Sequence, residues 1–106
     1  MNRLTGRQLL EAIEVLRDNK DKYNEFEYWQ IYFIFRKEFY NSAAWILLSK
    51  EVREETPFCE RCFRDNRILH AHHIKRLYTH TYLGLEKSNL EVLCILCHRK
   101  EHRKVA

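Results

Sequence analysis

The apolar positions in the first half of the chain recur at helical spacing. Residues 5–20 and 42–54 each place apolar side chains along one side, which predicts two amphipathic helices. Between them, residues 25–40 are dense in aromatic side chains, which favour strands. A length of about four turns and the polar pair Arg36-Lys37 nevertheless favour a helix there too.

Polar residues mark where these helices begin. Thr5 with Gln8, and Asn24 with Glu27, have the spacing of a capping box, in which each side chain bonds a backbone N–H that the helix leaves unpaired. Ser42 is a suitable N-cap for the remaining helix. The start of each predicted helix is therefore specified locally.

The aromatic side chains of this half, led by Trp29 and Trp45, are predicted to pack in a core between the helices. Two other interpretations remain open for residues 28–40. They could form a stacking platform for nucleic acid, or the surface of a homodimer.

Length and composition fit a globular protein of one domain. The chain has 106 residues, of which 45% are apolar and 32% charged, which excludes disordered and collagen-like classes. Pro57 disfavours helical geometry at Thr56, so the helical part should end there. The predicted organisation is a helical region over residues 1–57 that packs on a core over residues 58–106, as one compact unit.

The hydropathy pattern also bears on the compartment. No apolar run approaches the roughly 18 to 20 residues that span a bilayer, so no membrane association is expected. The first residues lack the uninterrupted apolar segment of a signal peptide, which predicts a cytoplasmic location. In that compartment the four cysteines are expected to be reduced thiolates for a metal rather than disulfides.

The net charge of +4 is unevenly distributed. Residues 1–58 carry nine Lys/Arg against ten Asp/Glu, whereas residues 59–106 carry ten against five. The same second half holds all four cysteines and all six histidines. A basic segment rich in Cys and His indicates a metal site that meets an anion, and nucleic acid is the obvious candidate.

The second half has the pattern of a small hairpin. Residues 68–74 partly alternate apolar and polar positions, which predicts a short strand with His72 and His73 on opposite faces. Residues 89–93 are predicted to form the return strand.

A helix is predicted to follow from Cys97. His98 and His102 are four residues apart and share a face of that helix, so they form a platform for a divalent ion. His70 and His80 fit no such pattern and are predicted to be structural or exposed.

Two Cys-x-x-Cys pairs bracket this hairpin, Cys59 with Cys62 and Cys94 with Cys97. Each pair can present two thiolates to one ion at tetrahedral angles, and two pairs complete a closed structural zinc site. A redox role would need a thioredoxin-like context, which is absent, and the spacing does not resemble that of the ferredoxin clusters. A site closed by four sulfurs leaves no position for water, so this zinc is not expected to be catalytic.

The order of these residues resembles the HNH endonuclease family of the ββα-metal superfamily. The resemblance covers residues 58–103 and rests on the His-His pair, Asn89, His98 and the two flanking cysteine pairs. It implies an α+β fold in which N-terminal helices precede a zinc-stapled ββα-metal core. Residues 39–45 weakly resemble the segment that precedes this core in small phage and prophage HNH proteins.

The resemblance also implies a role for each site residue. His73 would be the general base that activates water, and Asn89 would hold the two strands in register by bonding across the loop. The implied ligands are Cys59, Cys62, Cys94 and Cys97 for structural zinc, and His72, His98 and His102 for a catalytic divalent ion. An all-nitrogen set favours Zn²⁺, Ni²⁺, Co²⁺ or Mn²⁺ over Mg²⁺. The basic residues expected to contact phosphates are Lys75, Arg76, Arg99, Lys100 and Arg103.

The function expected from these residues is metal-dependent hydrolysis of DNA phosphodiester bonds, by nicking or by double-strand cleavage. The alternative is a non-catalytic zinc-stabilised module that binds nucleic acid or protein, and a third possibility is a nuclease that acts on RNA. The family resemblance also suggests a phage terminase as a partner and a bacterial host cell as the setting. A homodimer is a further alternative that the sequence leaves open.

Overall fold

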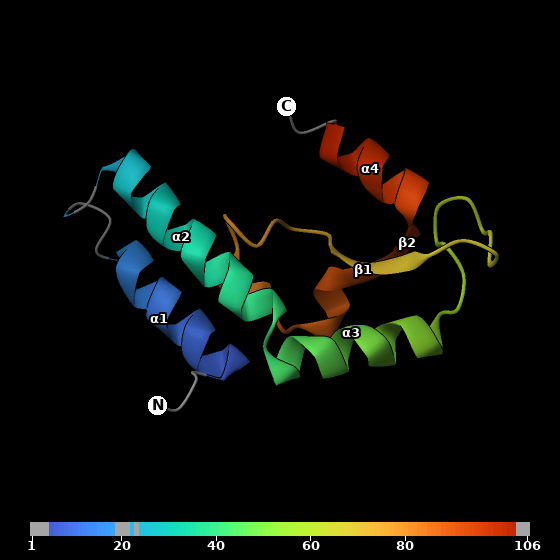
Figure 1. The fold of residues 1–106 in the computed structure, drawn as a ribbon, viewed down its shortest axis with the longest axis horizontal. Coiled ribbons are helices and arrows are strands. Elements are labelled where there is room, and N and C mark those ends of the chain that lie inside the picture. The colour runs from blue at the N-terminus through green and yellow to red at the C-terminus, as the bar shows by residue number, and fades with distance from the viewer. Residues whose placement is uncertain (1–4, 19–21, 23, 104–106) are drawn as a thin grey trace. The chain divides into compact units, whose positions relative to one another are not determined.

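The computed structural model describes residues 5–18, 22 and 24–103. It has the predicted α+β fold, with helices followed by a hairpin and a last helix (Figure 1). The elements are α1 (Gly6–Asp18), α2 (Glu25–Tyr40), α3 (Ala43–Glu55), β1 (Leu69–His73), β2 (Leu90–Cys94) and α4 (Ile95–Arg103), with short 3-10 turns at Thr81–Leu83 and Lys87–Asn89. None of the helices in these ranges combines the length and the apolar character that a membrane span requires.

The predicted caps are present at the start of the first two helices. Thr5 and Gln8 exchange hydrogen bonds of 2.8 and 3.1 Å between side chains and backbone N–H groups. Asn24 and Glu27 do the same before α2, at 2.8 and 3.3 Å. Each pair satisfies backbone donors that a helix leaves unpaired, which explains why the helices begin where the sequence indicates.

Two compact units divide the chain. One contains the described residues up to Leu47 together with Lys75–Leu85, and the other contains Leu48–Ile74 and the described residues from Glu86 on. The predicted organisation, residues 1–57 packed on residues 58–106 as one unit, stays a prediction.

The first unit is built on α1 and α2, which lie side by side (Figure 1). The ring of Tyr32 packs edge-on against that of Tyr78, with 4.8 Å between the ring centroids. This contact holds the Lys75–Leu85 segment against α2. Gly84 permits close packing in this unit, because a Cβ there would lie 2.8 Å from a methyl carbon of Leu10 and 2.9 Å from one of Leu77. Among the described side chains of the two helices, the buried ones are Leu10, Ile13, Tyr28, Tyr32, Phe35 and Phe39.

The prediction that Trp29 lies in the core is wrong, whereas Trp45 is buried as predicted. Trp29 is 51% exposed and Trp45 8% exposed. The buried side of α2 is occupied by Tyr28 and its neighbours at helical spacing. One residue further along the helix, Trp29 is rotated by about 100° and faces outward. It stacks on Phe33, whose ring is also half exposed.

The second unit contains the hairpin and α4. β1 and β2 pair antiparallel (Figure 1). His72 lies opposite Glu91, and His73 lies opposite Leu90. The last helix begins at Ile95, two residues before the predicted start, because the Ile95 N–H bonds the Ile68 carbonyl at 3.0 Å and the chain turns directly out of β2. The hairpin and α4 together give the ββα order that the resemblance implied.

Candidate metal centres

The four cysteine sulfurs converge on one point. Each offers an Sγ atom within 4.8 Å of the others, and the Cys62 and Cys94 sulfurs are 3.7 Å apart. Sulfurs at about 2.3 Å from a tetrahedral zinc ion would be separated by about 3.8 Å. The spacing therefore fits a four-cysteine zinc site, formed by the loop after α3 and by the junction of β2 with α4.

Backbone geometry shapes the first cysteine loop for this purpose. The N–H groups of Arg61 and Cys62 both point at the Cys59 sulfur, at 3.4 Å. Phe63 has a φ of 63°, the left-handed conformation that turns the chain back, and its N–H bonds the Cys59 carbonyl at 2.8 Å. Because a non-glycine residue adopts this conformation at a cost, its presence indicates that the loop is held by its surroundings.

The pKa values of two of the thiols are shifted in opposite directions. Burial raises the pKa of Cys59, but donated N–H bonds outweigh it and bring the value down to about 6. Burial and the neighbouring sulfurs instead raise the pKa of Cys97 to about 12. Four thiolates this close repel one another unless a positive ion lies among them, and zinc supplies that charge.

Three histidines form a second cluster. His72 comes from β1, and His98 and His102 come from successive turns of α4. One ring nitrogen of each lies within 4.8 Å of the others, and the Nε2 atoms of His98 and His102 are 3.0 Å apart. Nitrogens at about 2.0 to 2.1 Å from a zinc-like ion would be about 3.4 Å apart, so small side-chain adjustments give a three-nitrogen site.

The surroundings keep two of these imidazoles neutral, as metal ligands must be. Burial, assisted by the charges of the neighbouring histidines, lowers the pKa of His98 to about 4. Burial also lowers the pKa of His72, although nearby Glu91 opposes the shift. Protons therefore compete weakly with an ion at these nitrogens near neutral pH.

The pKa of His98 predicts a pH-dependent stability. The unfolded chain, with an ordinary histidine pKa of 6.5, binds this proton more readily than the folded chain does between about pH 6.5 and 4. The free energy of unfolding should therefore fall as the solution is acidified through that window. Replacing His98 with glutamine should make the decline shallower, as measured by urea unfolding at several pH values. His80→Gln is the matched control, and equal slopes in all three proteins would contradict the prediction.

His70, which the sequence prediction placed outside any metal-binding pattern, lies beside the histidine cluster. Its ring stacks on His98, with 5.2 Å between centroids and 23° between planes. Its Nε2 atom is buried and has no hydrogen-bond partner among the described residues. The strand periodicity contained the signal, because residues two apart on a strand share a face, which puts His70 beside His72.

Arg61 links the cysteine loop to the elements that carry the histidines. Its guanidinium donates to Glu91 on β2 at 2.8 Å and to Glu101 on α4. Glu91 lies opposite His72 in the hairpin, and Glu101 precedes His102. The two contacts span 30 and 40 residues of sequence, so no local pattern could have predicted them.

Replacing Arg61 with methionine should loosen the histidine cluster and leave the zinc bound. We expect Ni²⁺ affinity at the histidines to fall by about 10- to 100-fold, the usual effect of losing groups that orient metal ligands. Calorimetric titration with Ni²⁺ measures this, and zinc content is determined in parallel. Arg64→Met, on the same loop and exposed, is the control. An unchanged Ni²⁺ affinity in the Arg61 variant would show that the link does not orient the ligands.

The predicted base and its positioning residue lie at the end of the hairpin. His73 is the last residue of β1 and is only 7% exposed, and it lies outside the three-histidine cluster. The Asn89 carbonyl accepts the Ile74 N–H at 2.8 Å, which closes the ladder directly beyond His73. Asn89 is thus placed where it can hold the strands, while its side-chain role stays a prediction.

The basic residues expected at phosphates are divided between the two units. Arg99 and Lys100 are exposed on α4, next to His98. Lys75 and Arg76 are exposed in the first unit, at the start of the Lys75–Leu85 segment. The side chain of Arg103 lies outside the described residues.

Comparison with known proteins shows what the second half is similar to. Residues 59–104 match the family model of the HNH endonucleases. Searches of curated proteins and of solved structures found no match. Residues 59–104 are thus similar to the HNH endonucleases, and they contain a ββα arrangement and four cysteines placed to bind zinc. The phage-like resemblance stays a prediction.

Proposed function

We propose that this protein is a metal-dependent endonuclease that hydrolyses DNA phosphodiester bonds. The observation that carries the proposal is the convergence of His72, His98 and His102, from a strand and the following helix, within a segment that matches the HNH endonucleases. That family match implies nuclease activity in general. The attribution to DNA and the roles of individual residues are the finer part of the proposal.

The chain's own residues supply the base and the phosphate contacts. A neutral His73 accepts a proton from the attacking water as its oxygen bonds to phosphorus and the bond to the 3′-oxygen breaks. Arg99 and Lys100 hold backbone phosphates next to the cluster, and Asn89 keeps β1 and β2 in register. His72, His98 and His102 would hold a divalent ion, which when bound would supply Lewis-acid stabilisation of the phosphate and the leaving oxygen. The leaving 3′-oxygen takes a proton from a water molecule, so the products are a 5′-phosphate and a 3′-hydroxyl.

The ligand set bears on the choice of ion. Three imidazole nitrogens suit Mn²⁺, Co²⁺, Ni²⁺ and Zn²⁺, whereas Mg²⁺ prefers oxygen ligands. We therefore propose that cleavage is supported better by these ions than by Mg²⁺. The four-cysteine site fits structural zinc and has no open position for substrate, so its role is to hold the domain together.

Conversion of supercoiled plasmid tests the proposal. The purified chain is incubated with plasmid and Mg²⁺, Mn²⁺, Ni²⁺ or no added ion, and the nicked and linear forms are resolved on gels. One such site cuts one strand, so nicked circles should precede linear product. An RNA substrate in the same assay separates a DNA nuclease from an RNA nuclease. Binding to DNA without cleavage under any ion would favour a non-catalytic zinc-stabilised module instead.

A further inference from the structure

The outward side of α2 presents aromatic rings to solvent. Phe26 is 68% exposed, and Trp29 and Phe33 are each 51% exposed. The rings of Trp29 and Phe33 stack, with centroids 5.5 Å apart and planes 19° from parallel. Leaving several large rings in water is unfavourable, and a contiguous exposed apolar patch of this kind usually marks a binding surface.

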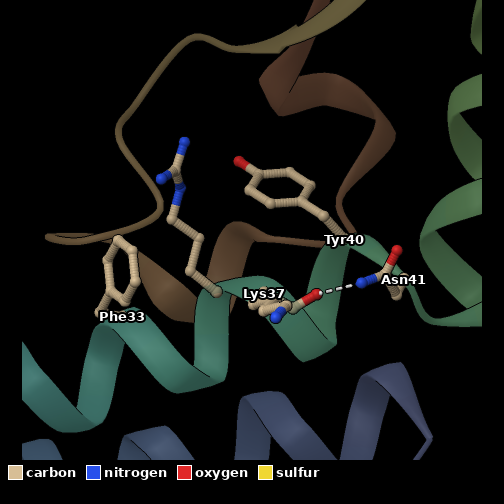
Figure 2. A pocket seen from close by; sticks show the side chains of 5 residues that line it. Phe33, Lys37, Tyr40 and Asn41 are labelled. Atoms are coloured by element: carbon tan, nitrogen blue, oxygen red, sulfur yellow. Dashed lines mark hydrogen bonds between the residues drawn. The ribbon is translucent and has the colours of Figure 1, made fainter.

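A pocket continues this surface toward the C-terminal end of α2. Its volume is about 270 Å³, and it is lined by Phe33, Arg36, Lys37, Tyr40 and Asn41. Figure 2 shows the rings of Phe33 and Tyr40 projecting from the same side of the helix. The guanidinium carbon of Arg36 lies 5.6 Å from the centre of the Tyr40 ring, and Asn41 closes the end of the helix by donating to the Lys37 carbonyl at 3.0 Å. The pocket therefore combines flat rings with two cations.

Charges are segregated around the helix. Successive residues of a helix are rotated by about 100° around its axis. On this basis five residues of α2 lie within a sector of roughly 100°, which we call the aromatic–basic stripe. They are Trp29, Phe33, Arg36, Lys37 and Tyr40. Glu27 and Glu38 lie about 160° to 180° from Trp29, on another side, whereas Glu25 lies about 40° from Trp29, one turn before it and about three turns from Arg36. Two positive charges thus stand beside the rings of Phe33 and Tyr40, and Glu25, the carboxylate of the helix on the side of the stripe, lies at its other end.

We propose that the aromatic–basic stripe binds unpaired bases of a nucleic acid strand. Bases stack on the exposed rings, and Arg36 and Lys37 bind the phosphates between them, the combination that single-strand binding surfaces use. Only unpaired bases offer free faces, so the surface selects single strands over duplex. A cavity of 270 Å³ lies just below the range of pockets for drug-sized ligands, which suits one base.

Charge complementarity favours this occupant over a second copy of the chain. In a symmetric dimer through this face, the stripe would meet the same stripe, and the one carboxylate of α2 on that side that could meet these cations is Glu25, in an antiparallel arrangement. A nucleic acid strand instead brings anions to them. This binding involves the helical unit and does not require the catalytic ion, so it can be tested separately from the nuclease activity.

Fluorescence of Trp29 tests the proposal directly. The chain has two tryptophans, so Trp45→Phe leaves Trp29 as the sole reporter. A 15-nucleotide single strand, titrated without added divalent ion, should quench this fluorescence, and the duplex of the same sequence should quench it far less. Gels run after the titration confirm that the strand is intact.

Variants of the stripe should weaken binding in two distinguishable ways. Phe33→Ala should reduce single-strand affinity by about 5- to 100-fold, the effect of losing one stacked base. Arg36→Gln with Lys37→Gln should reduce the slope of log affinity against log salt by about 1.4, because two phosphate contacts are lost. Lys22→Gln with Lys50→Gln removes the same charge from exposed positions off the stripe and should change neither stacking nor quenching.

Three results would overturn the proposal. One is equal quenching by single strand and duplex. Another is an affinity that Phe33→Ala leaves unchanged. The third is a dimer, measured by light scattering, that Trp29→Ala converts to monomer, since the face would then be an interface between copies. The substituted stripe positions are exposed, and circular dichroism verifies that every variant folds. Plasmid cleavage that persists alongside any of these results would leave the nuclease proposal intact.

Discussion

Replacing Cys94 with serine is expected to release one zinc ion per chain and to unfold the hairpin and α4. Cys94 is 1% exposed at the end of β2, and its sulfur lies within the four-sulfur cluster. Binding of structural zinc contributes about 10 to 16 kcal/mol in small zinc-dependent folds, comparable with or larger than the roughly 5 to 15 kcal/mol that stabilises a whole domain. Loss of the ion should therefore leave the second unit unfolded.

Two measurements check this result, with a neighbouring substitution as control. Metal content is determined after dialysis, and circular dichroism follows the thermal transition. Val92→Ala removes a fully buried side chain from the same strand without touching a sulfur. It should lower the melting temperature yet keep the zinc bound. If Cys94→Ser retained its zinc and its thermal transition, the assignment of the four cysteines to zinc would be wrong.

Replacing His73 with alanine is expected to lower the rate of plasmid cleavage by about 100- to 10,000-fold, the usual contribution of a positioned general base. DNA binding should change little, since the basic residues on α4 are untouched. The rates are measured from the disappearance of supercoiled plasmid at saturating Mn²⁺ or Ni²⁺. Because His73 is buried, zinc content and circular dichroism must first show that the variant is folded.

His80 provides the matched control for this experiment. It is a histidine outside both clusters, and its Nδ1 atom is 2.8 Å from the Thr79 hydroxyl in the first unit. His80→Ala should therefore cleave at close to the unsubstituted rate. Equal losses in the two variants would indicate a general effect of removing an imidazole, and full activity of His73→Ala would require another base.

The features that sequence predicted correctly are those fixed by neighbouring residues or by simple spacing. Thr5 with Gln8 specifies a helix start through contacts three residues apart. The cysteine pairs predicted one cluster because a tetrahedral ion restricts how two such loops can meet. His98 and His102 share a face because a helix repeats every 3.6 residues. The ββα architecture followed from these patterns together with the family resemblance.

The features that sequence missed depend on contacts between distant segments. The exposure of Trp29 depends on which side of α2 faces α1, and aromatic content alone does not determine this. Arg61 could be recognised as a link only after Glu91 and Glu101 had been brought to it across 30 and 40 residues. His70 was placed outside the predicted site for a different reason. The strand alternation puts it on the same face as His72, but only His72 matched the family motif.

The route of the chain through the two units limits how this protein can be divided. Lys75–Leu85 belongs to the unit of α1 and α2, although β1 and β2 on either side belong to the other. Within it, Leu77 is 4% and Thr81 0% exposed, and the Thr81 hydroxyl donates to Glu14 on α1. The segment that carries the HNH signature is therefore not a transferable module. Joined alone to another protein, it would expose side chains that α1 and α2 cover here, and a functional graft would have to include both helices.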